Sequence, residues 1–292
     1  MKKAYEVAGH IFTVEMPEGY PLWDLMGQYE PFGIPVPEAG VIFSLEWAPE
    51  LPEREKTPVY TEIPEENGQA RIELYRIEGG WRFEMAPLAK APTCCWLETD
   101  EDYTRATLSV VPERRSALFA LNNSLMILFA FRTASLGTLE MHSSVVVRDG
   151  KGYMFLGKSG TGKSTHSRQW LETFPGTELL NDDNPVIRAD AEGSVRVYGT
   201  PWSGKTPCYR KLDVPVGAIV RIRQSPENRA TRLGLVEAYA SVYSSCSGLK
   251  AERKIADGLH ETLERVVTAV PCFVLDCRPD HEAAEVCYEA VR

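Results

Sequence analysis

The interpretation of this sequence begins at the stretch Gly157-Lys158-Ser159-Gly160-Thr161-Gly162-Lys163-Ser164. It fits the phosphate-binding pattern G-x-x-x-x-G-K-[ST]. The apolar residues 153–156 predict a strand before it, and residues 164–174 predict a helix after it. Its glycines permit a tight curl in which backbone N–H groups converge on phosphate oxygens, and the helix start adds further donors. A glycine-rich turn without a ligand is the alternative, and the flanking strand and helix favour the phosphate loop.

Individual side chains of this stretch have predicted roles. The Lys163 ammonium would reach the β- and γ-phosphates, and the Ser164 hydroxyl would bind Mg²⁺. Thr165 completes the predicted nucleotide-binding segment, so ATP and Mg²⁺ are the expected ligands. His166 and Arg168 follow in the first turns of the predicted helix, where we expect them to be exposed to solvent.

Two carboxylates lie about one helix further along the chain. Asp182 and Asp183 follow the apolar pair Leu179-Leu180, so a strand is expected to end there beside the phosphate loop. One carboxylate can hold Mg²⁺, directly or through water, and the other can accept the proton of an attacking hydroxyl. Neighbouring side chains of an extended strand point to opposite faces, so both reach the phosphates only if the strand ends. A polar turn without catalytic function is the alternative.

The register of a predicted hairpin gives His142 a place. The Asp-Gly dipeptide at 149–150 is a strong two-residue turn, and it pairs Arg148 with Lys151. Continued, the same register puts His142 opposite Gly157, within one position. An imidazole there could help to ionise the catalytic carboxylate or contact a phosphate. A purely structural histidine is the alternative.

Two further polar groups are candidates for contacts with phosphate or substrate. The segment 199–205 carries two glycines, two hydroxyls and a lysine, and Ser203 and Lys205 would make it a second anion-binding loop. A tight loop after a strand explains the segment equally well. Arg221 and Arg223 alternate on one predicted strand, so they share a face, where they can bind phosphate or pair with surface carboxylates.

Bulk composition argues against several classes of protein. Of the 292 residues, 43% are apolar and 25% are charged, which is ordinary for a soluble globular protein of one or two domains. The net charge of −9 argues against a general nucleic-acid or membrane-surface binder. No signal segment begins the chain, and the most apolar run, 125–131, is far shorter than the roughly 20 residues of a membrane span. Seven cysteines without paired C-x-x-C spacing predict reduced thiols, no zinc site and a cytoplasmic protein.

The predicted elements divide the chain into two regions. Residues 1–112 are rich in alternating strand patterns, interrupted at 48–69 by a segment of Pro and Glu that predicts an exposed connection. Pro112 begins a predicted core helix that runs to about residue 135, and strands and helices then follow to the C-terminus. The sequence therefore predicts a β-rich region over 1–112 and an α/β nucleotide-binding domain over 113–292.

Together these residues resemble a known family. The sequence LEMHSSVV at 139–146, the phosphate loop and LLNDD at 179–183 resemble the catalytic core of the bacterial HPr kinase/phosphorylase family. Its members have a P-loop fold related to ATP-dependent phosphoenolpyruvate carboxykinase, and they phosphorylate a serine hydroxyl with ATP and Mg²⁺. The resemblance implies a P-loop kinase core of this type with a β-rich N-terminal region. It also implies that His142 is the histidine before the phosphate loop, and that Asp182 and Asp183 are the carboxylate pair that serves as base and metal partner, with the order of the two roles left open.

This chain also departs from the family pattern. The resemblance covers residues 139–190 well and the rest of the C-terminal half loosely. HPr kinases carry an acidic residue where this chain has Thr165, and their arginine–glycine signature has no counterpart here. The segment 200–205 instead resembles that of uncharacterised HPr-kinase-related bacterial proteins. Related proteins act on free serine or on serine in modified peptides, so the acceptor is a hydroxyl of a protein, a peptide or a small molecule.

The main hypothesis is a cytoplasmic ATP/Mg²⁺-dependent kinase. Its predicted catalytic residues are Lys163, His142, Asp182 and Asp183, and its predicted metal ligands are Ser164 and the two aspartates. A nucleotide-binding regulatory protein without transfer activity is the second hypothesis. A carboxykinase-like lyase and a GTPase are weaker, because neither a second metal-ligand set nor a guanine-reading N-K-x-D is present. The sequence leaves open the acceptor, the reverse phosphorylase reaction and the formation of homo-oligomers.

Overall fold

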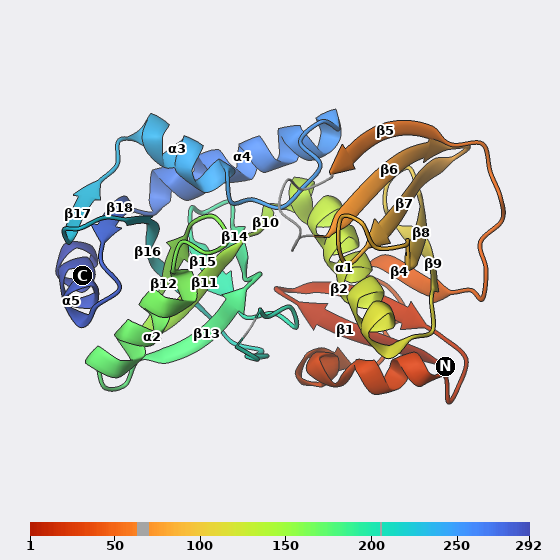
Figure 1. Cartoon of the computed structure of the whole chain (residues 1–292), viewed down its shortest axis with the longest axis horizontal. Coiled ribbons are helices and arrows are strands. Elements are labelled where there is room, and N and C mark those ends of the chain that lie inside the picture. The colour runs from red at the N-terminus through yellow and green to blue at the C-terminus, as the bar shows by residue number, and fades with distance from the viewer. Residues whose placement is uncertain (63–69, 205) are drawn as a thin grey trace. The chain divides into compact units, whose positions relative to one another are not determined.

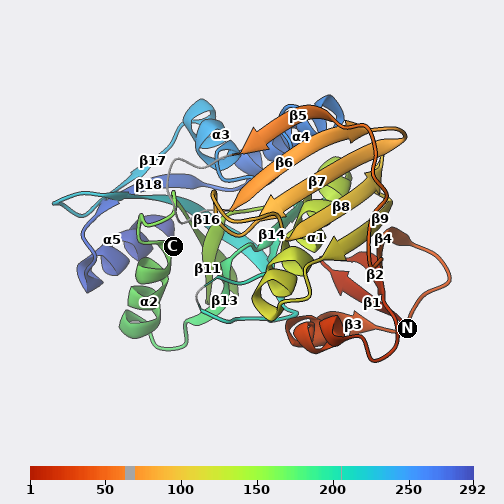
Figure 2. The ribbon, with the colours of Figure 1, turned by 45° about the vertical axis from the view of Figure 1, so that its right-hand side comes forward.

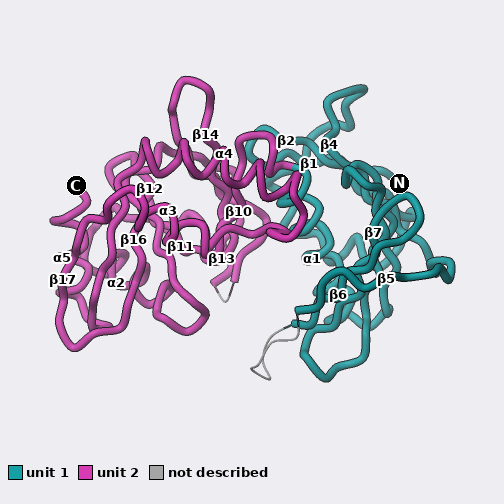
Figure 3. Tube along the Cα trace, turned by 90° about the horizontal axis from the view of Figure 1, so that it is seen from above, with its two compact units in different colours: residues 1–132 teal, residues 133–292 magenta. Residues whose placement is uncertain are grey.

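The computed structural model describes residues 1–62, 70–204 and 206–292. The chain forms two compact units, Met1–Arg132 and Thr133–Arg292 (Figure 3). Each unit has its own sheet of nine described strands, accompanied by helices (Figure 1). The protein is therefore mixed α/β with two sheets.

The sheet of unit 1 has the strand order β3-β1-β2-β4-β9-β8-β7-β6-β5. Its strands are β1 (Lys2–Val7), β2 (His10–Glu15), β3 (Gly33–Ile34), β4 (Val41–Trp47), β5 (Thr57–Glu62), β6 (Arg71–Ile77), β7 (Gly80–Ala86), β8 (Cys95–Asp100) and β9 (Arg105–Val110). Two 3₁₀ segments precede β3, namely η1 (Pro21–Leu25) and η2 (Gly27–Phe32).

Helix α1 (Arg114–Thr133) completes the core of this sheet. Leu125 and Phe129 of α1 are fully buried, and the ring of Phe129 packs edge-on against Phe12 of β2 at 6.5 Å. The domain boundary expected at residue 112 and the division observed after Arg132 differ by this one helix. The reason is that the apolar stripe of α1 covers the N-terminal sheet.

The apolar helix that contains residues 125–131 is longer than that run alone. With the 3₁₀ turn η3 (Ala134–Leu136), the helix Arg114–Leu136 reaches 23 residues and a mean hydropathy of 1.3, enough for a membrane span by length and composition. The apolar run at 125–131 is thus the centre of a longer apolar helix. In the most apolar 18-residue stretch of this helix, 56% is buried inside the fold, as in the core helix of a soluble protein. Length and composition are therefore weak evidence for a membrane span.

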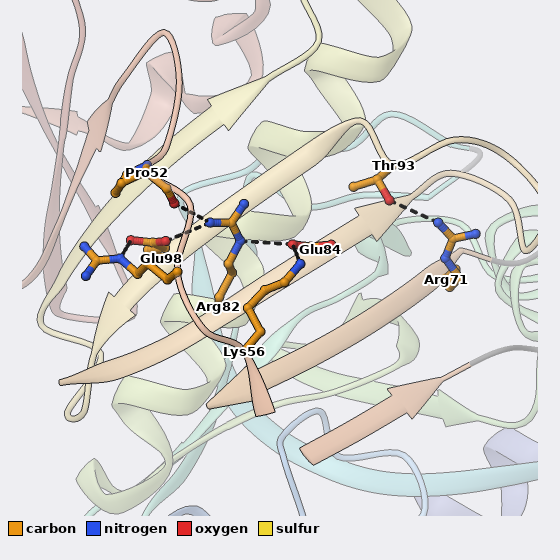
Figure 4. Close-up of polar contacts among 8 residues, drawn as sticks. Pro52, Lys56, Arg71, Arg82, Glu84, Thr93 and Glu98 are labelled. Atoms are coloured by element: carbon orange, nitrogen blue, oxygen red, sulfur yellow. Dashed lines mark hydrogen bonds and ion pairs between the residues drawn. The ribbon is translucent and has the colours of Figure 1, made fainter. Parts of the chain in front are cut away.

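Charged side chains cover part of the sheet in unit 1 (Figure 4). Arg82 of β7 and Glu98 of β8 are cross-strand partners, both are buried, and Arg82 Nη1 donates to Glu98 at 2.9 Å. Glu84 accepts hydrogen bonds from Arg82 at 3.0 Å and from Lys56 at 2.6 Å. Arg54 donates to the second oxygen of Glu98 at 3.0 Å. Alternating charges therefore attach the segment before β5 to the sheet.

Strand β5 corrects the prediction of an exposed connection over 48–69. It pairs antiparallel with β6 at the edge of the sheet, and all six of its residues are exposed. Because β5 has no buried side, its sequence lacks the apolar alternation by which a half-buried strand is recognised. The remainder of the predicted connection, 63–69, lies outside the described residues.

Truncation of α1 tests its place in the core. We expect Leu125→Ala to lower the free energy of unfolding by about 2–5 kcal/mol, because it leaves a cavity at a fully buried position. Leu88→Ala is the matched control, since Leu88 is 46% exposed, and we expect it to cost less than about 1 kcal/mol. Urea denaturation followed by fluorescence measures both. Equal effects of the two substitutions would contradict the packing of α1.

The sheet of unit 2 follows the order β10-β14-β15-β16-β12-β11-β13, with β18 beside β16 and β17 beside β18. Its strands are β10 (Thr138–Glu140), β11 (Ser143–Arg148), β12 (Lys151–Leu156), β13 (Glu178–Asp183), β14 (Val186–Ala189), β15 (Val195–Tyr198), β16 (Asp213–Gln224), β17 (Arg229–Arg232) and β18 (Cys272–Cys277). Its helices after η3 are α2 (Lys163–Thr173), α3 (Leu235–Tyr243), α4 (Arg253–Ala269) and α5 (His281–Val291). Strands β12, β16 and β18 run parallel to one another.

Helices α2 and α5 lie side by side on this sheet (Figures 1 and 2). Trp170 of α2 and Cys287 of α5 are fully buried in one apolar cluster with Phe155 of β12. The cluster fixes α2 on β12, and thereby sets the two ends of the connection between them.

The hairpin predicted around residues 149–150 is confirmed, with its register. Arg148 pairs with Lys151, and Ser143 pairs with Leu156 at the far end of the ladder. The chain before this turn forms two strands, because β10 pairs with β14 whereas β11 pairs with β12 and β13. His142 lies in the break between them.

Candidate functional site

The connection between β12 and α2 is a curled loop that requires glycine. Gly160 and Gly162 have φ of 81° and 105°, in the left-handed region that strains other residues. A Cβ on Gly157 would lie 2.3 Å from Thr161 Oγ1, so that position excludes a side chain. The tip of the loop, residues 158–160, is exposed. The strand, loop and helix thus occur in the order that the motif predicts.

Lys163 folds back over this loop. Its Nζ donates to Gly157 O at 3.0 Å and lies 2.8 Å from His142 Nε2. Burial lowers the pKa of Lys163, against the opposing influence of Asp183 and then Asp182. Both carboxylates therefore act electrostatically on the motif lysine.

His142 connects Lys163 to Asp183. Its Nδ1 lies 3.2 Å from Asp183 Oδ1, while its Nε2 faces the ammonium. An imidazole with its proton on Nδ1 satisfies both contacts, since it donates to the carboxylate and accepts from the ammonium. The backbone N–H of His142 donates to Ser245 O at 2.8 Å, which holds the break between β10 and β11. The structure thus brings together three predicted residues, of which His142 and Lys163 lie 21 positions apart in the sequence.

The carboxylate of Asp182 is buried, and the described residues offer it no hydrogen-bond donor. The residue is 5% exposed, and neither carboxylate oxygen has a partner among the described residues. It pairs with Ser144 of β11, whose hydroxyl lies 2.6 Å from that of Ser167 in α2, so it lies on the face that α2 covers. A buried carboxylate of this kind is costly unless a cation or a donor reaches it. The residues present therefore fit a bound cation.

The donor set fits Mg²⁺ held together with a phosphate. Within the described residues, no group of three or more His, Cys, Asp and Glu side chains forms a metal cage. Mg²⁺ is usually held by one or two carboxylates, with water and phosphate oxygens completing the shell. Asp182 and Asp183 supply two carboxylates beside Lys163, and the next residue in the chain, Ser164, has an exposed hydroxyl.

Arg221 is anchored close to the loop. In the parallel register of β16 and β12 it lies beside Leu156. It donates from Nε to Ser241 Oγ at 2.7 Å, and from Nη2 to Ser244 Oγ at 2.8 Å and to Ser245 Oγ at 3.0 Å. Its charge also contributes to the lowered pKa of Lys163. Arg221 is thus a fixed cation at the edge of the site.

The other residues predicted to contact phosphate or substrate, Arg223 and Ser203, bind other groups of the protein in this structure. Arg223 forms a two-bond ion pair with Asp276 at 2.8 and 2.9 Å, which is the surface-carboxylate alternative. Ser203 bridges the end of β13 through its backbone at Asp183. Its hydroxyl donates to Thr206 O at 2.6 Å, and Lys205 lies outside the described residues.

His166 corrects the expectation of solvent exposure, whereas Arg168 is exposed as expected. His166 is 2% exposed, its ring packs edge-on against Phe155 at 4.6 Å, and its Nε2 accepts from Trp170 Nε1 at 3.0 Å. Burial lowers the pKa of His166 to about 4. It lies one turn after Lys163, on the helix face that packs on β12, and a 3.6-residue periodicity would have identified that face.

Glu140 is a titratable residue near the site that the sequence analysis missed. It is 2% exposed at the end of β10, two residues before His142. Burial raises the pKa of Glu140 to about 8, Ser247 opposes that shift, and Asp183 adds to it. The carboxyl group is therefore mostly protonated at pH 7. The position of Glu140 between Leu139 and Met141 could have indicated a buried glutamate.

A cavity of about 400 Å³ adjoins the loop. Its walls come from residues 160–162, from the first two turns of α2 at Thr165 and Gln169, and from Gln224 at the end of β16. Arg278, after β18, also lines it. The cavity therefore adjoins residues 160–162 of the loop.

Comparison with known proteins gives little. No protein-family model and no curated protein sequence matches this chain. Among solved structures, the Hpr(Ser) kinase/phosphatase from Coxiella burnetii matches with a TM-score of 0.31 and 11% identity, over 52% of this chain and 95% of that chain. A similarity this weak carries no argument, so the functional proposal rests on the residues described above.

The buried imidazole predicts a pH dependence of stability. Unfolded His166 takes up a proton below about pH 6.5, whereas the folded protein does so only near pH 4, so unfolding becomes more favourable as the pH falls through this window. The full effect is about 3 kcal/mol. We expect the difference in unfolding free energy between wild type and His166→Gln to change by this amount from pH 7 to pH 4. Parallel curves for the two proteins would show that His166 is not the cause.

Proposed function

We propose that this protein is an ATP/Mg²⁺-dependent kinase that transfers the γ-phosphoryl group to a hydroxyl. The observation that carries the proposal is the run of contacts from Lys163 through His142 to Asp183, next to the buried carboxylate of Asp182, which has no hydrogen-bond partner among the described residues. A glycine turn without a ligand gives no reason for this arrangement. We further propose a P-loop kinase core for unit 2 and a cytoplasmic location.

The loop and two cations would bind the triphosphate. Backbone N–H groups of residues 157–162 and of the start of α2 are the proposed phosphate donors. Lys163 would exchange its contacts with Gly157 O and His142 for phosphate oxygens. Arg221, held by three serine side chains, would add a second positive charge without the cost of ordering a mobile side chain.

The two aspartates would have different roles. Asp182 and Ser164 would hold Mg²⁺, which when bound neutralises charge on the β- and γ-phosphate oxygens. Asp183 would accept the proton of the acceptor hydroxyl, because it is the carboxylate in contact with the imidazole. His142 would keep Asp183 in place and stabilise its charge. The acceptor is a hydroxyl of a protein, a peptide or a small molecule.

The cavity beside the loop would take the nucleoside. Gly160–Gly162 and Thr165 line it, whereas His142 and Asp183 are not among its lining residues. Its volume of about 400 Å³ is in the range of small-molecule sites. Arg278 is held in place by Asp280 and Glu282, so it would present a fixed guanidinium face to a base.

Substitution of the motif lysine tests the kinase. We expect Lys163→Ala to reduce transfer of the labelled γ-phosphate from ATP at least about 100-fold, because developing charge loses its fixed cation. Free serine, serine peptides and cell extract serve as acceptors. Lys151→Ala is the control, since Lys151 is an exposed lysine at the opposite end of β12. Transfer that survives in Lys163→Ala would overturn the mechanism, and ATP binding without transfer to any acceptor would favour the regulatory alternative.

Comparison of two ligands tests the nucleoside cavity. We expect Arg278→Ala to weaken ADP binding about tenfold and to leave pyrophosphate binding unchanged, because only ADP extends into the cavity. Arg253→Ala is the matched control, because Arg253 is an exposed arginine of α4 in an i,i+4 ion pair. Isothermal titration calorimetry measures all the affinities. An equal loss for ADP and pyrophosphate would place the nucleoside elsewhere.

A further inference from the structure

The two proposed catalytic carboxylates pose a geometric problem. Asp182 and Asp183 are consecutive residues of β13, and a regular strand directs consecutive side chains to opposite faces. The proposed site needs both of them beside the phosphate loop. Both aspartates are still paired with β11, and β13 ends at Asp183, so the backbone must turn directly after this pair.

The side chain of Asn181 binds the backbone at the end of β13. This side chain is fully buried, and its Oδ1 accepts the backbone N–H groups of Asp183 and Asn184, both at 3.0 Å. One side-chain oxygen thus takes two donors in succession. Such side-chain-to-backbone bonds are an alternative to the sheet ladder, and they turn the chain where they form.

Thr200 fixes the orientation of Asn181. The Nδ2 group of Asn181 donates to Thr200 Oγ1 and to Trp202 O, both at 3.0 Å. Thr200 is itself fully buried, and its hydroxyl donates to Asn184 O at 2.7 Å. The amide cannot rotate by half a turn, because its oxygen has two donors and its nitrogen has two acceptors. Four hydrogen bonds therefore fix the orientation of the Asn181 amide.

The same bonds attach the segment 199–204 to the end of β13. Gly204 N donates to Asp182 O at 3.1 Å, and Ser203 forms an isolated bridge with Asp183. A Cβ on Gly204 would lie 2.6 Å from Asp182 O, so this approach requires glycine. The backbone of this segment therefore packs on the carboxylate pair.

We infer that Asn181 and Thr200 are positioning residues that hold the carboxylates of Asp182 and Asp183 for Mg²⁺ and for the proton. The inference rests on the proposed function and adds two residues that act through the aspartates. Metal ligands commonly depend on such supporting hydrogen bonds, and loss of one costs roughly 10–100-fold in metal affinity.

Two substitutions of Thr200 distinguish the contribution of its hydroxyl group from that of its side-chain volume. Thr200→Val keeps the volume and removes the hydroxyl, whereas Thr200→Ser keeps the hydroxyl. The affinity for ADP is measured by calorimetry with and without Mg²⁺. We expect Thr200→Val to lose about tenfold or more of the Mg²⁺-dependent gain in affinity, with unchanged affinity for metal-free ADP. We expect Thr200→Ser to match wild type and Asn181→Ala to match Thr200→Val.

The outcomes distinguish this inference from the proposal on which it rests. If wild type and Thr200→Val gain equally from Mg²⁺, the positioning role is wrong and the kinase proposal stands. A loss of metal-free ADP binding in both Thr200→Val and Asn181→Ala also overturns the role, because the effect is then not confined to the carboxylates. If wild-type ADP binding shows no Mg²⁺ dependence, the proposed function fails, and the inference fails with it.

Discussion

The arrangement of unit 2 depends on the meeting of two strand ends on either side of β11. The end of β12 carries the loop with Lys163, and the end of β13 carries the two aspartates. Because β11 pairs with both strands, it sets their separation, and the break before β11 places His142 between them. Without this common partner, the lysine and the carboxylates would have no fixed distance. Helix α2, which packs on β12 through Trp170 and His166, fixes the other end of the loop.

Local features of the sequence predicted the part of the site that is built locally. The turn at 149–150 and the loop at 157–164 follow from residue types at fixed spacing, so the register that places His142 could be worked out. The polar turn after Leu180 was also recognisable. Its partner Thr200, however, lies 19 residues from Asn181 and is brought to it only by the folded sheet. The burial of His166 depends on Phe155 in the same way.

Unit 1 shows a second limit of sequence patterns. Its core helix was recognised from its apolar spacing, yet the residues that it covers lie in strands far earlier in the chain. Spacing gives a helix an apolar face and says nothing about the sheet that receives it, which is why the expected boundary fell before α1. Strand β5 was missed for the opposite reason, since charge pairing rather than burial holds its approach to the sheet.

The protonated state of Glu140 has an electrostatic consequence for the order of assembly. With Glu140 neutral, two anions, Asp182 and Asp183, face three cations, namely Lys158 and Lys163 of the loop and the anchored Arg221, so one positive charge is left over. A lone divalent cation would add to this excess of positive charge. Metal and triphosphate arriving together as a net anion would instead offset it.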